Sequence, residues 1–197
     1  LLERKDTGDV MREIILRYED MKYNLYRRPY NEELRTFGEA EMVYDAASIG
    51  KSATLPRISP DGKFLMFAMA EYGVFHIWHK DADLYSIKLE NGFIRKMHEI
   101  CSNDVESYHS YSSNGRWVIF SSRRYDGNFT RPFIAYIDED GIGRRPFELP
   151  QENPNFHREF MKSYNIPEFM SGPVKISPHE FSTLIKNTEN IQATQRN

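Results

Sequence analysis

A sequence repeat constrains the fold of this chain more than any other feature. The stretch Thr54–Phe67 aligns with Ser107–Phe120 at an offset of 53 residues. Each copy has a short segment that ends in Ser, a turn with Asp-Gly or Asn-Gly, one cation and a run of large apolar residues. Because Asp-Gly and Asn-Gly tolerate the positive φ of a hairpin turn, each copy predicts a strand, a tight turn and a buried strand.

A second pair of segments extends each copy to a unit of four strands. Strand-like runs over Asp83–Gly92 and Phe133–Gly141 end in Asn-Gly or Asp-Gly, and Phe93–Met97 and Arg145–Leu149 follow them. Upstream, Asn24–Asn31 matches Asp83–Glu90, with Glu39–Tyr44 as its partner strand, and downstream Val174–Pro178 resembles the start of another unit. The unit therefore occurs about two and a half times.

Four short antiparallel strands in about 50 residues are typical of a propeller blade. We expect an all-β fold, a partial β-propeller of about two and a half to three four-stranded antiparallel blades over residues 1–181, with a polar tail over 182–197. Closed propellers have at least about four blades. This chain alone is short of a ring, so either further blades lie upstream or it assembles with other copies.

One or two short helices are expected near the C-terminus. Phe156, Phe160, Met161 and Tyr164 have roughly helical spacing within Asn153–Gly172 and predict a helix over the loop face. A second helix is expected over His179–Lys186, with Ser177 as N-cap and Pro178 at its first position. Near the N-terminus, apolar residues between Val10 and Tyr18 fit one helical face, yet Arg12–Tyr18 stands where a blade strand belongs, and we favour a strand.

Composition excludes several classes of protein. The net charge of −3 disfavours a dedicated nucleic-acid-binding protein, and the longest apolar run, Phe64–Ala70, is too short for a transmembrane segment. One cysteine excludes an internal disulfide framework and a multi-cysteine zinc site. Gly50-Lys-Ser lacks the first glycine of a P-loop, Asp138–Gly143 lacks the last calcium ligand of an EF-hand, and no G-x-S-x-G motif occurs. We therefore expect no cofactor.

The segment Ser59-Pro-Asp-Gly-Lys63, followed by Phe-Leu-Met-Phe, resembles the repeats of TolB-like β-propellers, the periplasmic Tol family and its relatives. The second copy departs from this motif, with Ser113-Asn114 in place of Pro-Asp. The resemblance extends over about Asn24–Leu149 and implies a periplasmic propeller of the bacterial cell envelope. Similar blades occur in peptidases of the prolyl oligopeptidase type and in oligogalacturonate lyases. The chain opens at Leu1 without a leader, and we expect it to be a piece of a longer protein.

Blade geometry predicts that all long loops emerge on one face, because the other face receives only minimal turns. Function concentrates on such loops. The candidates for binding a ligand or partner on this face are His76, Trp78, His79, Asp81, Asp104, Glu106, His109, Arg123, Arg124, Asp126 and Arg131. For each residue, tying adjacent loops together is the competing structural role. We expect Trp78 and Phe75 to pack between blades.

Three histidines, His76, His79 and His109, are the best metal candidates, and Glu106 could supply a further ligand. The leading hypothesis is nonetheless a non-enzymatic binding or scaffold module of the cell envelope, whose partner is a protein, peptide or glycan. The alternative is a metal-dependent lyase or hydrolase acting on an acidic polysaccharide. A third hypothesis is self-association through open blade edges.

Overall fold

Two four-stranded antiparallel sheets form the body of the molecule in a computed structural model, which describes residues 15–188. The first sheet contains β5 (Ser52–Ile58), β6 (Phe64–Ala70), β7 (Asp83–Lys88) and β8 (Phe93–Lys96), and the second contains β9 (Glu106–Tyr111), β10 (Trp117–Ser122), β11 (Arg131–Tyr136) and β12 (Phe147–Glu148). In both sheets the strands are hydrogen-bonded in chain order. This order confirms the two predicted blades.

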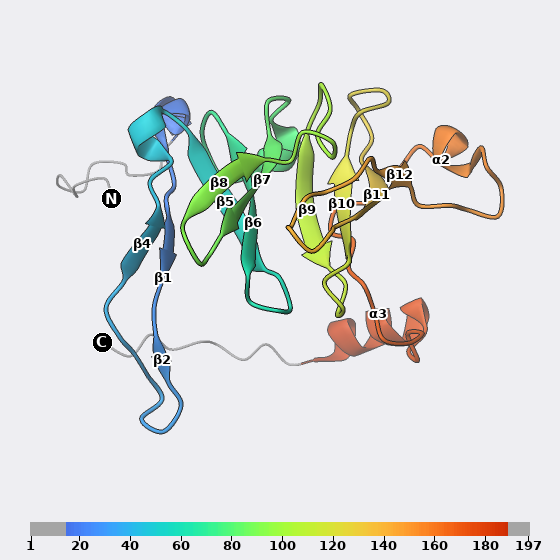
Figure 1. The fold of residues 1–197 in the computed structure, drawn as a ribbon. Coiled ribbons are helices and arrows are strands. Elements are labelled where there is room, and N and C mark those ends of the chain that lie inside the picture. Colours follow the sequence, from blue (N-terminus) through green and yellow to red (C-terminus); the bar gives the residue numbers. More distant parts are fainter. Residues whose placement is uncertain (1–14, 189–197) are drawn as a thin grey trace.

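The two blades stand side by side and bury their facing sides (Figure 1). Side chains alternate between the two faces of a strand. Met66 and Ala68 of β6 therefore join Phe120 of β10 in one apolar cluster, whereas Leu65 and Phe67 point the other way into a second cluster. This alternation explains why β6 is buried along its whole length.

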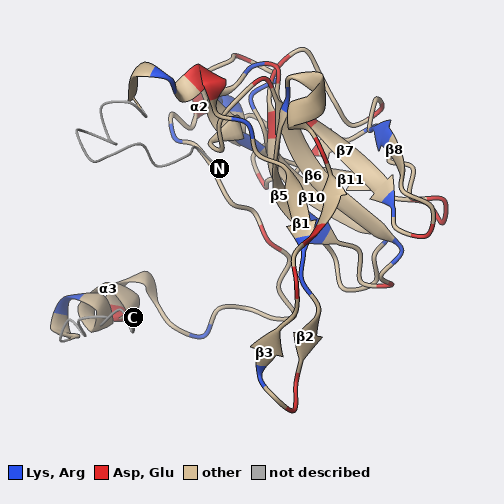
Figure 2. Ribbon diagram, turned by 90° about the vertical axis from the view of Figure 1, so that its left-hand side faces the viewer, with Lys and Arg blue, Asp and Glu red and all other residues tan. Residues whose placement is uncertain are grey.

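A half-blade covers the opposite side of the first sheet. Strands β1 (Leu25–Arg27) and β4 (Glu41–Tyr44) pair antiparallel, and Leu25 packs into the second apolar cluster. This pairing is the one predicted from the match to the third strand of the unit. The chain between them continues as a hairpin, β2 (Tyr30–Asn31) and β3 (Thr36–Phe37), which stands clear of the sheets (Figure 2).

The predicted N-terminal strand is wrong where the structure describes it. Residues 15 and 16 are helical, and a 3-10 helix, η1 (Tyr18–Asp20), follows. Backbone hydrogen bonds within this stretch are local, such as the one from Asp20 N to Arg17 O at 3.0 Å. Residues 12–14 of the expected strand lie outside the described residues.

In place of a third blade, the C-terminal part has two helices and, between them, residues 160–177, which we call the strap. Helix α2 (Phe156–Glu159) is shorter than predicted, because the chain after it hydrogen-bonds to the second blade: Tyr164 N donates to Thr130 O at 3.1 Å. Val174–Ser177 forms no strand, so the predicted start of a further unit is wrong.

Helix α3 (Pro178–Asn187) confirms the second predicted helix. Ser177 accepts from Glu180 N at 3.2 Å, Glu180 Oε2 accepts from Ser177 N at 2.8 Å, and Pro178 takes the first position. Residue 182, the expected start of a polar tail, lies within α3, and the division into domains stays a prediction. Between residues 15 and 188, no helix combines the length and apolarity needed to cross a bilayer.

In the two four-stranded sheets, the long loops emerge at one end and the tight turns at the other (Figure 1). Two further 3-10 helices, η2 (Ala47–Ile49) and η3 (His76–Trp78), lie in these loops. The opposite end has the turns with Gly62 and Gly115, both at positive φ. We call these the long-loop face and the turn face. The connection between β1 and β4 is an exception, because its β2–β3 hairpin extends from the turn end, so the prediction that the turn face receives only minimal turns is wrong there. The fold thus places the predicted candidates at or near the long-loop end, apart from His109, which lies in the middle of β9.

Candidate binding face

Glu106 and Arg124 form a buried ion pair just beneath the long-loop face. Arg124 Nη2 lies 3.0 Å from Glu106 Oε1, and the Glu106 side chain has no exposed surface. Ser102 donates to the same carboxylate through its backbone N at 2.9 Å and its Oγ at 2.6 Å, and Ser122 Oγ donates at 2.9 Å. Burial raises the pKa of Glu106. This network ties the start of β9 to the end of β10.

Arg124 is further fixed by groups of both blades. Its Nη2 donates to Ile100 O at 2.7 Å, and its guanidinium lies 4.4 Å from the ring centroid of Phe133. A guanidinium engaged on this many sides has little left to offer a ligand. Glu106 and Arg124 therefore position the loops.

His76 and His109 also lie in the interior. His76 pairs with Thr54 Oγ1 at 3.0 Å and with Gly73 O at 3.0 Å, and His109 Nε2 lies 3.0 Å from Met66 O. Burial lowers the pKa of His76 to about 4 and that of His109 to about 4. Both imidazoles are thus neutral at pH 7 and link strands or loops.

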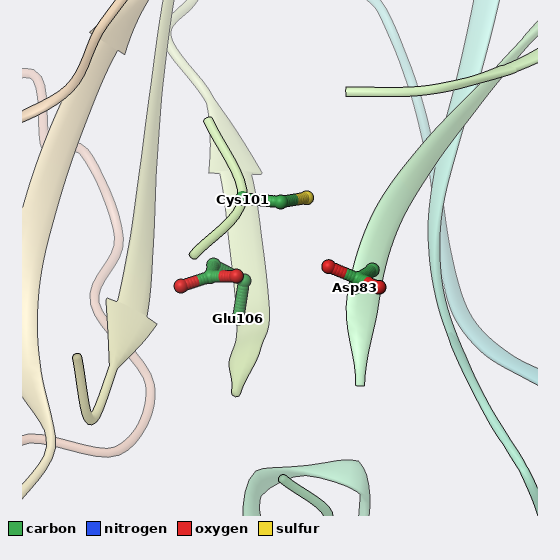
Figure 3. Close-up of side chains that lie close together, drawn as sticks. All are labelled: Asp83, Cys101 and Glu106. Carbon is green, nitrogen blue, oxygen red and sulfur yellow. The ribbon is translucent and has the colours of Figure 1, made fainter. Parts of the chain in front are cut away.

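In the part of the chain that the structure describes, His76, His79 and His109 do not come together as a group of three possible metal ligands. Within residues 15–188, one group of three possible ligands comes within 4.8 Å of one another, and it contains Asp83, Cys101 and Glu106 (Figure 3). Each of these groups already has partners. Asp83 Oδ2 is 2.5 Å from Lys96 Nζ, and burial raises the pKa of the Cys101 thiol far above its usual range. The Asp83 and Glu106 carboxylates are thus already paired with Lys96 and Arg124.

The remaining acidic candidates stabilise loops. Asp81 Oδ2 accepts from Glu71 N at 2.7 Å, and Asp104 Oδ1 accepts from Val105 N at 2.8 Å. Asp126 Oδ1 accepts from Asn128 N at 2.8 Å and from Phe129 N at 2.9 Å. The bonds of Asp126 cap a turn, whereas the bond of Asp81 joins the two ends of the loop after β6.

Arg131 and His79 differ in how far their side chains are exposed. Arg131 is 3% exposed, lies 3.8 Å from Asp126 Oδ2 and donates to Lys162 O at 2.9 Å, so it holds the strap on the blade. His79 is half-buried, and its ring packs edge-on against Tyr72 at 4.4 Å. Of these two residues, His79 alone presents part of its side chain on the long-loop face.

Trp78 and Arg123 form the part of the candidate set that faces outward. Trp78 is 72% exposed, and the Arg123 guanidinium lies 5.1 Å from its ring centroid. Arg123 Nη1 donates to Ile77 O at 3.3 Å and Nη2 donates to Gly127 O. Two backbone carbonyls therefore fix the cation over the indole.

Two more aromatic side chains lie exposed in the same two loops. Phe75 is 68% exposed and Tyr125 is 60% exposed. The expectation that Trp78 and Phe75 pack between blades is wrong, because Ile77 takes the buried position of η3 instead. Sequence reasoning did not single out Tyr125. Its place directly after Arg123-Arg124 in a long loop was the available signal.

We call Phe75, Trp78 and Tyr125, which are exposed, together with the half-buried His79 and Arg123, the aromatic–arginine patch; of these, Trp78 and Arg123 are in contact. It comes from the two loops that follow β6 and β10, the equivalent strands of the two blades. The patch combines large apolar surface with a fixed cation, which suits a partner that brings apolar groups and an acceptor or an anion.

No family model and no curated protein matches the sequence. The chain is similar to the crystal structure of TolB from Acinetobacter baumannii, with 18% identity over 61% of this chain and 26% of that one, at a TM-score of 0.38. It is also similar to the β-propeller domain of the Trilobed protease from Pyrococcus furiosus, with 14% identity over 64% and 39% of the two chains, at 0.37. A puromycin hydrolase structure shares 14% identity over 66% and 21%, at 0.45.

These similarities agree with the resemblance to TolB-like propellers noted in the sequence. At TM-scores below 0.5, the assignment as a partial β-propeller depends on the strand order and packing described above. The chain spans between about a fifth and two fifths of the length of these structures. Their activities therefore say nothing of this chain.

Proposed function

We propose that this chain is a non-enzymatic propeller module that binds a protein, peptide or glycan through the aromatic–arginine patch. The observation that carries the proposal is the exposed Trp78 ring under a guanidinium held by two carbonyls. Tryptophan, tyrosine and arginine are the residues most enriched among interface hot spots. A cation already fixed in place loses little side-chain entropy when a partner binds.

The geometry does not favour the metal-dependent lyase or hydrolase. Two of its three supposed histidine ligands are engaged with backbone carbonyls inside the blades. The binding module instead uses residues that are on the surface already. We place the module in the periplasm as part of the same proposal, supported by the sequence resemblance to TolB-like propellers.

A selection experiment with the whole chain tests this proposal. The purified chain is immobilised and screened against a random peptide library displayed on phage and against an array of glycans. Ligands that emerge are then titrated against Trp78→Ala and Arg123→Ala. Hot-spot truncations cost about 2 kcal/mol or more, so we expect affinity to fall by about 30-fold or more.

A matched control lies away from the patch. Phe93 on β8 is 58% exposed and also lies beside an arginine, since the Arg95 guanidinium is 5.7 Å from its ring centroid. Phe93→Ala should leave ligand affinity unchanged. If neither library gives a ligand, or if ligands bind Trp78→Ala as tightly as the original chain, the proposal is wrong.

A further inference from the structure

Among residues 15–188, no other blade covers one of the two faces of the second blade. One side of this sheet packs on the first blade through Val118 and Phe120. The other side, which we call the distal face, presents Trp117, Tyr136 and Phe147. Their rings meet edge-on, with centroids 5.4 Å apart for Trp117 and Tyr136 and 6.4 Å apart for Trp117 and Phe147. These three side chains are 37%, 38% and 46% exposed.

The repeat shows what belongs on such a face. Trp117 is the first residue of β10, as Phe64 is the first residue of β6. Each pairs with the third strand of its own blade, Trp117 with Tyr136 and Phe64 with Lys88, so the two positions are equivalent. Phe64 is only 6% exposed, and its ring packs against Gly141, in the outer turn of the next blade. The position of Trp117 is therefore one that a neighbouring blade covers inside the stack.

The same register extends the equivalence to the third aromatic residue. Phe147 pairs with Ile134 as Arg95 pairs with Ser86, so Phe147 stands where Arg95 does in the first blade. Arg95 donates to Asp140 O of the second blade at 2.8 Å. Tyr136 stands where Lys88 does in the first blade, and Phe147 stands where Arg95 does. Aromatic rings thus replace two basic side chains, which makes the distal face more apolar than the equivalent face of the first blade.

The chain's own strap covers only the other half of the distal face. Ser121 Oγ lies 2.8 Å from Tyr164 O and 2.7 Å from Asn165 O, so its one proton is donated to the strap, and Ser121 is fully buried. Ser121 lies near the long-loop end of β10, whereas Trp117 lies at its turn end. The strap therefore shields the long-loop end and leaves the aromatic cluster open.

The half-blade at the other end of the stack also has an open face. Tyr26 and Met42 are directly opposite each other in the β1–β4 pairing and are 59% and 52% exposed. Leu25 points the other way and is buried against the first blade. We call the face with Tyr26 and Met42 the proximal face.

We propose that the distal face binds the proximal face of a second copy of this chain, in the arrangement that consecutive blades have within one copy. The half-blade of the second copy then continues the stack. Its β2–β3 hairpin is the connection equivalent to the turn with Gly141, so it lies over the aromatic cluster as Gly141 lies over Phe64. The paired rings of Tyr30 and Phe37, 52% and 66% exposed on that hairpin, supply the apolar partner surface.

Such an interface is heterologous, since two different faces meet. One copy in such a dimer keeps its proximal face free and the other keeps its distal face free, so further copies can add unless the assembly closes into a ring. Light scattering on the whole chain between about 5 and 200 µM should then give a mass that rises from 23.3 kDa to a multiple of it. Trp117→Glu and Met42→Glu should each remain monomeric over this range.

Mixing the two monomeric variants separates this geometry from others. Trp117→Glu retains an intact proximal face and Met42→Glu retains an intact distal face, so an equimolar mixture should form a heterodimer. If like faces paired instead, the mixture would contain no species that neither variant forms alone. That result, or a wild-type chain that stays monomeric at 200 µM, would overturn the proposal.

Tryptophan fluorescence gives a second readout that does not depend on mass. The chain has two tryptophans, Trp78 and Trp117. In Trp78→Phe the remaining indole is at the proposed interface, and its emission should shift to shorter wavelength as concentration rises. In Trp117→Phe the remaining indole is on the long-loop face, and its emission should stay constant. A shift to shorter wavelength in Trp117→Phe alone would mean that the copies associate through the long-loop face.

Discussion

Replacing Arg124 with alanine removes the cation paired with a carboxylate that has no exposed surface. Loss of one partner from a buried pair costs about 3–5 kcal/mol, because an uncompensated charge stays behind. Glu106 keeps its three hydrogen bonds from Ser102 and Ser122, which offset part of this loss. We therefore expect Arg124→Ala to lower the free energy of unfolding by about 3 kcal/mol.

The deficit should depend on pH in a defined direction. Burial raises the pKa of Glu106 already, and removal of Arg124 raises that pKa further. The pKa of Glu106 in the unfolded chain is about 4.5. Above this pH, Glu106 of the folded variant keeps a proton that the unfolded chain releases, so the free energy of unfolding falls as the pH rises. The difference between Arg124→Ala and the original chain should shrink when the pH falls from 7 to 5.

Urea denaturation at the two pH values measures both effects, with Arg144→Ala as the control. Arg144 Nη2 lies 2.6 Å from Asp138 Oδ2, a shorter distance than in the buried pair, but Arg144 is 61% exposed. Its removal should cost less than about 1 kcal/mol. If Arg124→Ala costs no more than Arg144→Ala, or if its deficit is the same at pH 7 and pH 5, the reasoning about burial is refuted.

Two further predictions concern the packing between blades and the response to acid. A Cβ on Gly141 would lie 2.6 Å from Phe64 Cε1, whereas a Cβ on Gly92, at nearly the same φ, meets open space. Gly141→Ala should therefore lower the melting temperature more than Gly92→Ala does. Equal losses in the two variants would contradict the packing of Gly141 against Phe64. Burial lowers the pKa of His109 from 6.5 to about 4, so the unfolded chain takes up a proton at higher pH than the folded protein does. The free energy of unfolding should therefore fall by about 3 kcal/mol as the pH falls from 6.5 to 4. His109→Gln should make the free energy of unfolding depend less on pH between 6.5 and 4 than it does in the original chain. Identical pH profiles for the two proteins would rule out this role for His109.

The blades were predictable from the sequence because local signals agree with the tertiary fold there. Asp-Gly and Asn-Gly turns fix both hairpins, and the apolar run of β6 is long enough for a strand buried on both faces. The repeat then supplies the strand order, which the structure confirms. Helix α3 was predictable for a similar reason, since its capping box and proline act within one turn.

The errors arose where long-range contacts override local patterns. The aromatic spacing after Asn155 predicts a longer helix, but α2 ends after one turn, because Tyr164 N donates to Thr130 O and Tyr164 O accepts from Ser121 Oγ. Periodicity cannot show which side of the loop η3 is buried, so His76 was expected at the surface and Trp78 inside. The structure places them the other way round.

Amide hydrogen exchange on the whole chain, with and without a saturating peptide or glycan from the selection, tests the proposed binding face most directly. We expect the ligand to slow exchange in the loops over residues 72–81 and 123–128, which present the aromatic–arginine patch. Exchange at the tight turns around Gly62 and Gly115 should stay unchanged. Slowed exchange confined to those turns would contradict binding through the long-loop face.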